Sequence, residues 1–320
     1  MDRQDVRVKS AKGLASAVKK KARDLGADLV NTATVERWTS SSAVDTTKIR
    51  VYPHSGYLPN ELLPSAKSYI MVAVRLLDGV LDHTTTNCRT TGVQGNFAYI
   101  HLNRRLHSIT YELARWLEDE KGHRSLPLGY NIGARYDHKA DDDDTIVGPA
   151  YGVFNMKRAA VLAGLGRQAR NGLVASPEFG TSIRLGCVIT AAPLTSDPVL
   201  AGESCPSGCN ICSRVCPTDA ISRDGKVDHL RCYSDVGRCG TQYVELKAEF
   251  KKRYPPDLPG ANYIENDYLS ADGMGNRLCK IACVALCPLG ERSMPDVHRR
   301  VKDFDAVVAH VALDGFPPGR

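Results

Sequence analysis

Nine of the eleven cysteines in this 320-residue chain lie between Cys205 and Cys287. Thiols gathered so densely constrain the fold, because the chain must either pair them as disulfides or bind metal with them. Disulfide frameworks are typical of short secreted domains with a signal peptide. This chain is long, and its charged start, MDRQDVRVKSAKG, is not typical of a signal peptide. The cysteines therefore indicate metal ligation in a reducing compartment.

The spacing of the first cysteine motif indicates an iron–sulfur cluster. The motif CPSGCNICSRVCP contains Cys205, Cys209, Cys212, Cys216 and the following Pro217. Bacterial ferredoxins carry C-x-x-C-x-x-C-x-x-x-C-P, in which three thiolates bind one cluster and the fourth ligates the other. The first gap is one residue longer here, and Gly208 within it allows the irregular backbone that this requires.

The second motif, CKIACVALCP, has three cysteines and needs a fourth ligand from elsewhere. Its members are Cys279, Cys283 and Cys287, followed by Pro288. Cys232 and Cys239 lie between the two motifs and are the candidates for that ligand. Crossed ligation predicts one 4Fe-4S cluster on Cys205, Cys209, Cys212 and Cys287. The second 4Fe-4S cluster then takes Cys216, Cys279, Cys283 and either Cys232 or Cys239.

Two zinc sites and structural disulfides are the alternatives. Zinc prefers paired C-x-x-C knuckles, and a proline after the last cysteine of two separate motifs is not expected of it. We therefore favour the clusters. The isolated Cys88 and Cys187 are interpreted as ordinary or buried thiols.

Hydrophobic periodicity in the first two thirds of the chain predicts a mixed sheet domain. Helical spacing marks residues 11–25 and 102–121, and short apolar runs at 69–77 and 182–190 predict buried strands. The Thr-, Gly- and Asn-rich stretch 84–98 is predicted to be a loop. Helices alternating with strands indicate an α+β fold with an α/β-type sheet domain.

Composition changes near residue 200, where Cys, Pro and Gly become frequent. We predict a sheet domain over residues 1–199 that binds cofactor and substrate, and a ferredoxin-type two-cluster domain over 200–295. Residues 296–320 are expected to form a C-terminal extension that packs back on the core.

Charge and hydropathy exclude some classes of function. The formal charge of +6 is diffuse, since basic runs at 19–23 and 250–254 alternate with the acidic run at 140–144. It does not favour nucleic-acid binding by itself. No run of eighteen apolar residues occurs, so we expect no membrane span and a cytoplasmic protein.

The order of motifs resembles the family of epoxyqueuosine reductases and reductive dehalogenases. The resemblance is carried by RAAVLAGLGRQARNGLVASPEFGTSIRLGCVITAAPL at 158–194, followed directly by the first cysteine motif and CPTDAI at 216–221. LLPSAKSYIMVAVRL at 62–76 also fits the family. Arg231-Cys232-Tyr233 resembles the family's isolated cysteine between the two motifs, which favours Cys232 over Cys239.

The resemblance implies two ferredoxin-type clusters and a corrinoid, cobalamin with its lower base detached. It implies a sheet domain of nitroreductase-like character, joined to a bacterial-ferredoxin-like domain. It also implies a small-molecule substrate and an external electron donor such as ferredoxin or flavodoxin. The cofactor-binding residues that it implies are Tyr99, Gly164, Gly166, Asn171, Gly172, Pro177, Gly180, Arg184 and Thr190.

The chain departs from epoxyqueuosine reductases at the residue that delivers the proton. The family's acidic donor aligns with Ala150, where no carboxylate is present. Tyr151 is the adjacent titratable side chain. It resembles the tyrosine that reductive dehalogenases use as proton donor. We therefore expect Tyr151 to be the proton donor, with Lys157 and Arg158 orienting the substrate or lowering the tyrosine pKa.

Three functions follow in order of preference. The first is a corrinoid-dependent iron–sulfur reductase, reductive-dehalogenase-like, that cleaves a carbon–halogen or carbon–oxygen bond of a small substrate. The second is an epoxyqueuosine reductase acting on tRNA, which the missing carboxylate makes the less favoured. The third is an iron–sulfur electron carrier or activase that binds no corrinoid.

Overall fold

The computed structural model of the chain describes residues 3–39, 57–86, 91–129, 154–216, 219–227, 282–290 and 298–303. The chain divides into two compact units. The sheet unit comprises Met1–Arg75, Leu102–Pro206 and Leu289–Glu291. The cysteine unit comprises Leu76–His101, Ser207–Pro288 and Arg292–Arg320. The domain boundaries expected near residues 199 and 295 stay a prediction.

The sheet unit is built on a four-stranded sheet in the order β1-β2-β6-β3, with every neighbouring pair antiparallel. Its strands are β1 (Leu29–Thr34), β2 (Ser68–Arg75), β3 (Ser125–Leu128) and β6 (Ile183–Thr190). The two apolar runs of the sequence, β2 and β6, form the central pair. This confirms both predicted strands and the mixed helix-and-sheet fold.

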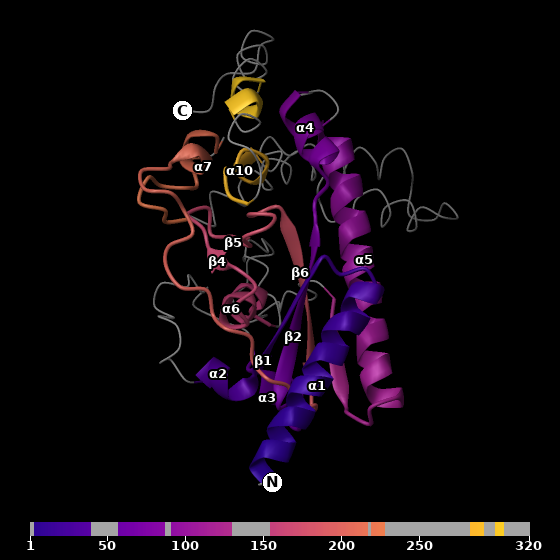
Figure 1. Cartoon of the computed structure of the whole chain (residues 1–320). Helices are drawn as coiled ribbons and strands as arrows, with labels where there is room; N and C mark the ends of the chain where they lie inside the picture. The colour runs from indigo at the N-terminus through magenta and orange to yellow at the C-terminus, as the bar shows by residue number, and fades with distance from the viewer. Residues whose placement is uncertain are drawn as a thin grey trace, which may run out of the picture. The chain divides into compact units, whose positions relative to one another are not determined.

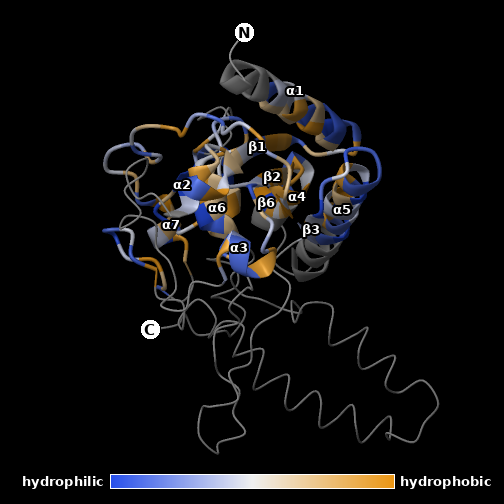
Figure 2. Ribbon diagram, turned by 90° about the horizontal axis from the view of Figure 1, so that it is seen from below, coloured by the Kyte–Doolittle hydropathy of each residue, from blue (hydrophilic) through white to orange (hydrophobic). Residues whose placement is uncertain are grey.

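Helices cover both faces of the sheet (Figure 2). On one face, α1 (Arg3–Asp24) and α5 (Thr91–Asp119) bury apolar side chains against β1, β2 and β6. On the other face lie α2 (Val35–Thr39) and α6 (Met156–Leu162), which share a second core with Tyr69, Met71 and Cys187. The short helix α3 (Pro59–Leu62) precedes β2. The helices predicted at 11–25 and 102–121 are thereby confirmed.

The loop predicted at 84–98 is wrong at every described residue of that stretch. Residues 84–86 complete α4 (Asp78–Thr86), and α5 already begins at Thr91. Thr and Gly have weak helical propensity, but extending a helix costs far less than starting one. The helix therefore extends from its strongly amphipathic part beyond residue 102 toward the N-terminus, as far as Thr91.

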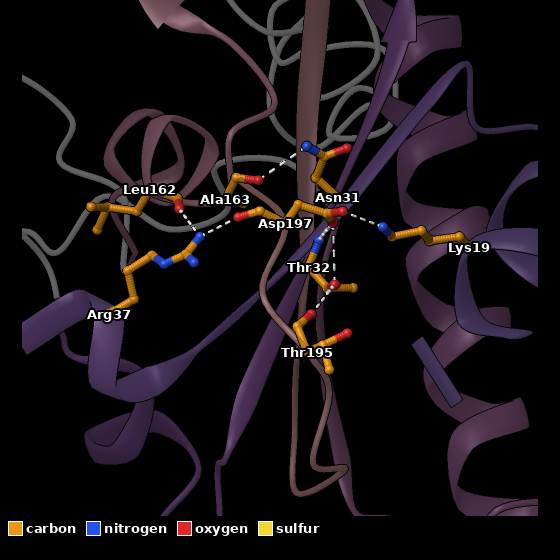
Figure 3. Close-up of polar contacts among 8 residues, drawn as sticks. All are labelled: Lys19, Asn31, Thr32, Arg37, Leu162, Ala163, Thr195 and Asp197. Atoms are coloured by element: carbon orange, nitrogen blue, oxygen red, sulfur yellow. Dashed lines mark hydrogen bonds and ion pairs between the residues drawn. The ribbon is translucent and has the colours of Figure 1, made fainter. Parts of the chain in front are cut away.

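The chain leaving β6 is fixed to the outer edge of β1 by Asp197 (Figure 3). Its backbone N–H donates to the Thr32 carbonyl at 2.8 Å, and its carboxylate accepts the Thr32 N–H at 2.8 Å. The same carboxylate forms an ion pair with Lys19 of α1, and the Asp197 carbonyl accepts a hydrogen bond from Arg37. One residue therefore joins strand, helix and outgoing chain.

In the cysteine unit, two short helices pack together through a small apolar core. These are α7 (Ile211–Arg214) and α10 (Ala282–Ala285). Val215, Ala282 and Leu286 are buried between them. Residues 298–303 form a further helical turn, from which Arg300 donates to Asp82 of α4 at 2.6 Å. The helices α7 and α10 thus lie side by side, although they are distant in sequence (Figure 1).

None of the helices in the described part of the chain is long and apolar enough to cross a lipid bilayer.

Replacing Asp197 should measurably destabilise the sheet unit. Asp197→Ala removes a half-buried carboxylate and leaves the N–H of Thr32, a fully buried residue, without its acceptor. Hydrogen bonds to charged groups contribute about 1.5–3 kcal/mol, so we expect a loss of about 2 kcal/mol. Urea denaturation followed by far-ultraviolet circular dichroism measures it. The control is Asp24→Ala, which breaks an exposed pair with Lys20 and should cost about 0.5 kcal/mol or less.

Candidate functional site

Six of the eight cysteines predicted to ligate clusters lie in the described part of the chain. Cys205 belongs to the sheet unit, and the other five belong to the cysteine unit: Cys209, Cys212, Cys216, Cys283 and Cys287. The predicted ligands Cys232 and Cys279, and the alternative Cys239, lie outside the described residues. Cys205 and Cys209 are not paired in disulfides.

The packing of α7 on α10 brings the two cysteine motifs together. Cys212 lies within α7 and Cys283 within α10. Cys216 and Cys287 follow the ends of these helices, next to the buried Val215 and Leu286. Ligands that alternate between two motifs require the motifs to be neighbours, and the two short helices are neighbours here. The crossed ligation itself stays a prediction.

Backbone N–H groups point at the sulfur atoms of two predicted ligands. Ala220 N–H donates to Cys216 Sγ at 3.3 Å, and Arg170 N–H donates to Cys205 Sγ at 3.3 Å. Such donors stabilise negative charge on sulfur and are a common second layer around metal-bound thiolates.

Within the residues that the structure describes, no three Cys, His, Asp or Glu side chains are gathered closely enough to hold a metal ion. The chemistry of the donor set nevertheless fits 4Fe-4S clusters. It consists of half-buried or buried thiols on two adjoining motifs, with N–H groups aimed at sulfur and no imidazole or carboxylate among the predicted ligands.

The β4–β5 hairpin stands beside Cys205 in the sheet unit. β4 (Arg167–Gln168) pairs with β5 (Val174–Ala175), and the connecting turn is closed by Gly172 N–H donating to the Ala169 carbonyl at 2.9 Å. Asn171 Oδ1 accepts the Leu173 N–H at 3.2 Å, and Gly172 has φ +74°. The turn therefore gives Asn171 and Gly172 a structural role as well as the predicted cofactor-binding one.

The AGLG segment forms the C-terminal cap of α6. Gly164 has φ +71° and donates its N–H to the Val161 carbonyl, while Leu165 N–H donates to the Ala160 carbonyl. This is the Schellman arrangement, which favours glycine at the left-handed position. Arg37 and Asn31 donate to the remaining carbonyls, those of Leu162 and Ala163 (Figure 3).

Close backbone approaches account for the other glycines. A Cβ atom on Gly164 would lie 2.0 Å from the Pro198 carbonyl oxygen, and one on Gly166 would lie 2.6 Å from that of Ala175. A Cβ atom on Gly180 would lie 2.1 Å from the Leu289 oxygen. The chain's own backbone fills these positions, so the three glycines do not form an open cradle for a corrinoid. Their predicted binding of the cofactor stays a prediction.

The remaining predicted cofactor residues are also engaged within the protein or lie at its surface. Arg184 of β6 donates twice to Asn103 Oδ1 of α5, at 3.1 and 2.7 Å. Thr190 is fully buried and accepts the Ala192 N–H at 3.1 Å. Pro177 is exposed. Tyr99 belongs to α5, but its side chain lies outside the described residues.

Of the predicted catalytic residues, Lys157 and Arg158 are on α6, and Tyr151 lies outside the described residues. Arg158 donates to the Trp38 carbonyl at 3.0 Å and its guanidinium lies over the Trp38 ring, 5.1 Å from the centroid. Burial lowers the pKa of Arg158. Its Nε, like Tyr69 Oη, is buried and has no hydrogen-bond partner within the described part of the chain.

Cys187 is a buried core thiol, as the sequence indicated. It has no exposed surface, it carries no disulfide, and burial raises its pKa. A thiol that stays protonated and shielded from solvent is a poor nucleophile and a poor metal ligand. Cys88 lies outside the described residues.

Sequence reasoning missed the residues that support Cys205. Ser204 Oγ donates to the Gln168 carbonyl at 2.6 Å, and the Arg170 backbone meets the sulfur. A serine next to a cysteine is too common to be informative, and a backbone donor carries no side-chain signal. Only the hairpin's position reveals these contacts.

The chain is similar in sequence to epoxyqueuosine reductases and to a reductive dehalogenase. Epoxyqueuosine reductase of Bacillus subtilis is 27% identical over 178 residues, 55% of this chain and 41% of the relative. That of Atelocyanobacterium thalassa is 30% identical over 165 residues, 51% of this chain and 46% of the relative. Tetrachloroethene reductive dehalogenase of Sulfurospirillum multivorans is 37% identical over 101 residues, 28% and 20% of the two chains.

No protein-family model matches the chain. Its matches span less than half the length of each of these three relatives. Among solved structures, a selenomethionine-labelled epoxyqueuosine reductase has a TM-score of 0.45 at 18% identity, covering 69% of this chain and 56% of that chain. A catabolic reductive dehalogenase has a TM-score of 0.47 at 17% identity, covering 69% and 29%. The sequence relatives confirm the resemblance in sequence.

The role of Gly164 as a helix cap predicts a strong penalty for any side chain there. Gly164→Ala forces a residue with a Cβ into the left-handed region and against the Pro198 carbonyl. We expect a loss of about 3 kcal/mol or more, from backbone strain of about 1–2 kcal/mol together with the clash. Thermal and urea unfolding measure it.

Gly13→Ala is the matched control, because Gly13 lies in α1 and a Cβ atom there meets nothing within 4 Å. It should stabilise the protein by about 0.5–1 kcal/mol through helical propensity. Equal stability of the two variants would contradict the capping role.

Proposed function

We propose that the chain is an iron–sulfur oxidoreductase holding two 4Fe-4S clusters in crossed ligation. The single observation that carries this proposal is the packing of α7 on α10, which joins the two cysteine motifs in one core. The first cluster takes Cys205, Cys209, Cys212 and Cys287. The second takes Cys216, Cys279, Cys283 and Cys232.

The clusters, when bound, supply electrons one at a time. The protein's own residues then have separate tasks. The α7–α10 core holds the cysteines of both motifs, and Ala220 N–H hydrogen-bonds Cys216 Sγ. The proposed electron donor is an external ferredoxin or flavodoxin, and the proposed compartment is the cytoplasm. A pure electron carrier without substrate is the alternative.

A corrinoid is proposed on the resemblance and on the names of the relatives, one of which is a reductive dehalogenase. Reductive dehalogenation in a solved structure is described as B12-dependent. The described candidate residues do not form an open cradle for it, as their glycines meet the protein's own backbone.

For the substrate, we reverse the order that the sequence alone suggested. Of the three relatives quoted above, the two with the longer alignments are epoxyqueuosine reductases. One solved epoxyqueuosine reductase holds a modified tRNA stem loop. We therefore place epoxyqueuosine in tRNA ahead of a small halogenated or oxygenated substrate. The small substrate stays the second candidate because there is no carboxylate at Ala150. The neighbouring Tyr151 instead matches the tyrosine donor that the resemblance to reductive dehalogenases implies.

The proposed proton donor remains Tyr151, with Lys157 and Arg158 orienting the substrate. Arg158 supports its part of this proposal, because its buried Nε–H is not donated to any described residue. Buried donors are normally satisfied, so an oxygen acceptor on a bound substrate is a natural partner. Its stacking on Trp38 would keep the guanidinium in place.

Crossed ligation makes a prediction about which variants share a defect. Cys216→Ala and Cys283→Ala should both remove the electron paramagnetic resonance signal of the same cluster, although the two residues belong to different motifs. Cys212→Ala should remove the other signal. The anaerobically prepared wild-type protein should contain about eight irons and eight sulfides per chain. If Cys212→Ala and Cys216→Ala, tested separately, both removed the signal of the same cluster, crossed ligation would be wrong. Stoichiometric zinc without iron would exclude the clusters.

The substrate and the corrinoid are tested together by anaerobic turnover. Cluster-loaded protein is incubated with hydroxocobalamin and freed of excess cofactor. It is then supplied with reduced ferredoxin as electron donor, and with either tRNA that carries epoxyqueuosine or halogenated phenols. Product from the tRNA and retained cobalamin absorbance are the expected results. Turnover of the phenols alone would select the dehalogenase-like candidate. No retained cobalamin and no turnover would leave the electron carrier as the function.

A further inference from the structure

The cysteine that begins the first motif is held by the β4–β5 hairpin. Ser204 Oγ donates to the Gln168 carbonyl of β4 at 2.6 Å, and Arg170 N–H from the hairpin turn donates to Cys205 Sγ at 3.3 Å. Ser204 Oγ also lies 3.8 Å from Cys205 Sγ. Both the backbone before Cys205 and its sulfur are thus in contact with the hairpin.

A third contact fixes the chain just upstream. Arg167 Nη1 of β4 donates to the Ala201 carbonyl at 2.6 Å. The segment from Ala201 to Cys205 therefore follows the hairpin from its first residue to its turn. These contacts all lie within the sheet unit.

The geometry of the turn explains why the Arg170 N–H is available. Arg170 is the second residue of the turn from Ala169 to Gly172, which is closed by the hydrogen bond between its first and last residues. The N–H of the second residue takes no part in that bond. It is therefore left to donate to the sulfur of Cys205.

Cys216 differs from Cys205 in the origin of its donor. The N–H that meets Cys216 Sγ comes from Ala220, only four residues further along the chain. The N–H that meets Cys205 Sγ comes from a hairpin 35 residues upstream in the sequence. A change in the hairpin should therefore affect Cys205 and leave Cys216 untouched.

We propose that the β4–β5 hairpin is a positioning element for one cluster only. Through Arg170 N–H and Ser204 it fixes Cys205 and raises the reduction potential of the cluster that Cys205 ligates. The inference rests on the proposed function, because it requires a cluster on Cys205. Reduction adds negative charge to a cluster with thiolate ligands, and an N–H donor to such a sulfur stabilises that charge.

Arg170→Pro is the variant that removes the N–H while preserving the turn. Proline has no backbone donor, and it is favoured at the second position of common four-residue turns. Arg170→Ala is its matched control, since it removes the charged side chain and keeps the N–H. Ser204→Ala removes the hydroxyl that anchors the backbone to Gln168, and Ser204→Thr keeps a hydroxyl there.

The readout is the midpoint potential of each cluster, followed by electron paramagnetic resonance during anaerobic redox titration. We expect Arg170→Pro to lower the midpoint potential of one cluster by about 59 mV, which corresponds to a tenfold change in the one-electron equilibrium constant. The other cluster should keep its potential. Ser204→Ala should shift the same cluster in the same direction by less, and Ser204→Thr should keep both wild-type values. Arg170→Ala loses the same side-chain charge as Arg170→Pro but keeps the N–H, so it should shift this cluster by clearly less than Arg170→Pro.

The outcomes separate this inference from the proposed function. A wild-type protein without iron overturns both. Two clusters whose potentials do not respond to Arg170→Pro overturn the role of the hairpin and leave the proposed function standing. Equal shifts in Arg170→Pro and Arg170→Ala, or shifts of both clusters, also overturn it. If Arg170→Pro fails to fold, the midpoint potentials of Ser204→Ala and Ser204→Thr are compared instead. Equal potentials in these two variants overturn the role of the hairpin.

Discussion

Strand β2 is buried on both faces, and this burial determines how the sheet unit is built. Every side chain from Ser68 to Val74 is inaccessible to solvent or nearly so. A strand of this kind needs a hydrogen-bonded neighbour on each edge and a helical layer on each face. β1 and β6 provide the edges, α1 and α5 one layer, and α2 and α6 the other. The helix that carries Arg158 is part of this arrangement, and Val174 of the hairpin that holds Cys205 packs in the same core.

The parts of this fold that could be predicted are those whose signal is local. β2 and β6 are continuous apolar runs, and α1 and α5 have helical periodicity. β1 and β3 were missed for physical reasons. β1, LVNTAT, is half polar, and its buried Thr32 is satisfied by Asp197. β3 contains Pro127 and is only four residues long, which is acceptable only because it lies at an edge of the sheet. Both strands depend on partners distant in sequence.

The candidate site shows the same division between local and long-range information. Cysteine spacing is a local signal for cluster ligation, because the number of residues between thiolates limits where their sulfurs can lie. A glycine run is ambiguous, since glycine serves equally where a ligand or the chain's own backbone comes close. At Gly164, the positive φ identifies a helix cap, and the nearby Pro198 oxygen leaves no room for a side chain. Neither fact can be read from the letters AGLG. Arg170 acts through its backbone, which no side-chain pattern reveals.

The segment between β6 and Cys205 links the stability of the sheet to the proposed redox site. Asp197 hydrogen-bonds Thr32, and the carbonyl of Pro198 lies against Gly164. At the end of the segment, Ser204 hydrogen-bonds the hairpin. Anchors so closely spaced leave the segment little freedom to adjust when charge on the sulfur changes. A donor already in place requires no rearrangement as charge develops, which favours both a defined potential and rapid electron transfer. The glycine at 164 is thus required twice, once to end α6 and once to let this segment lie close enough to carry Cys205 to Arg170.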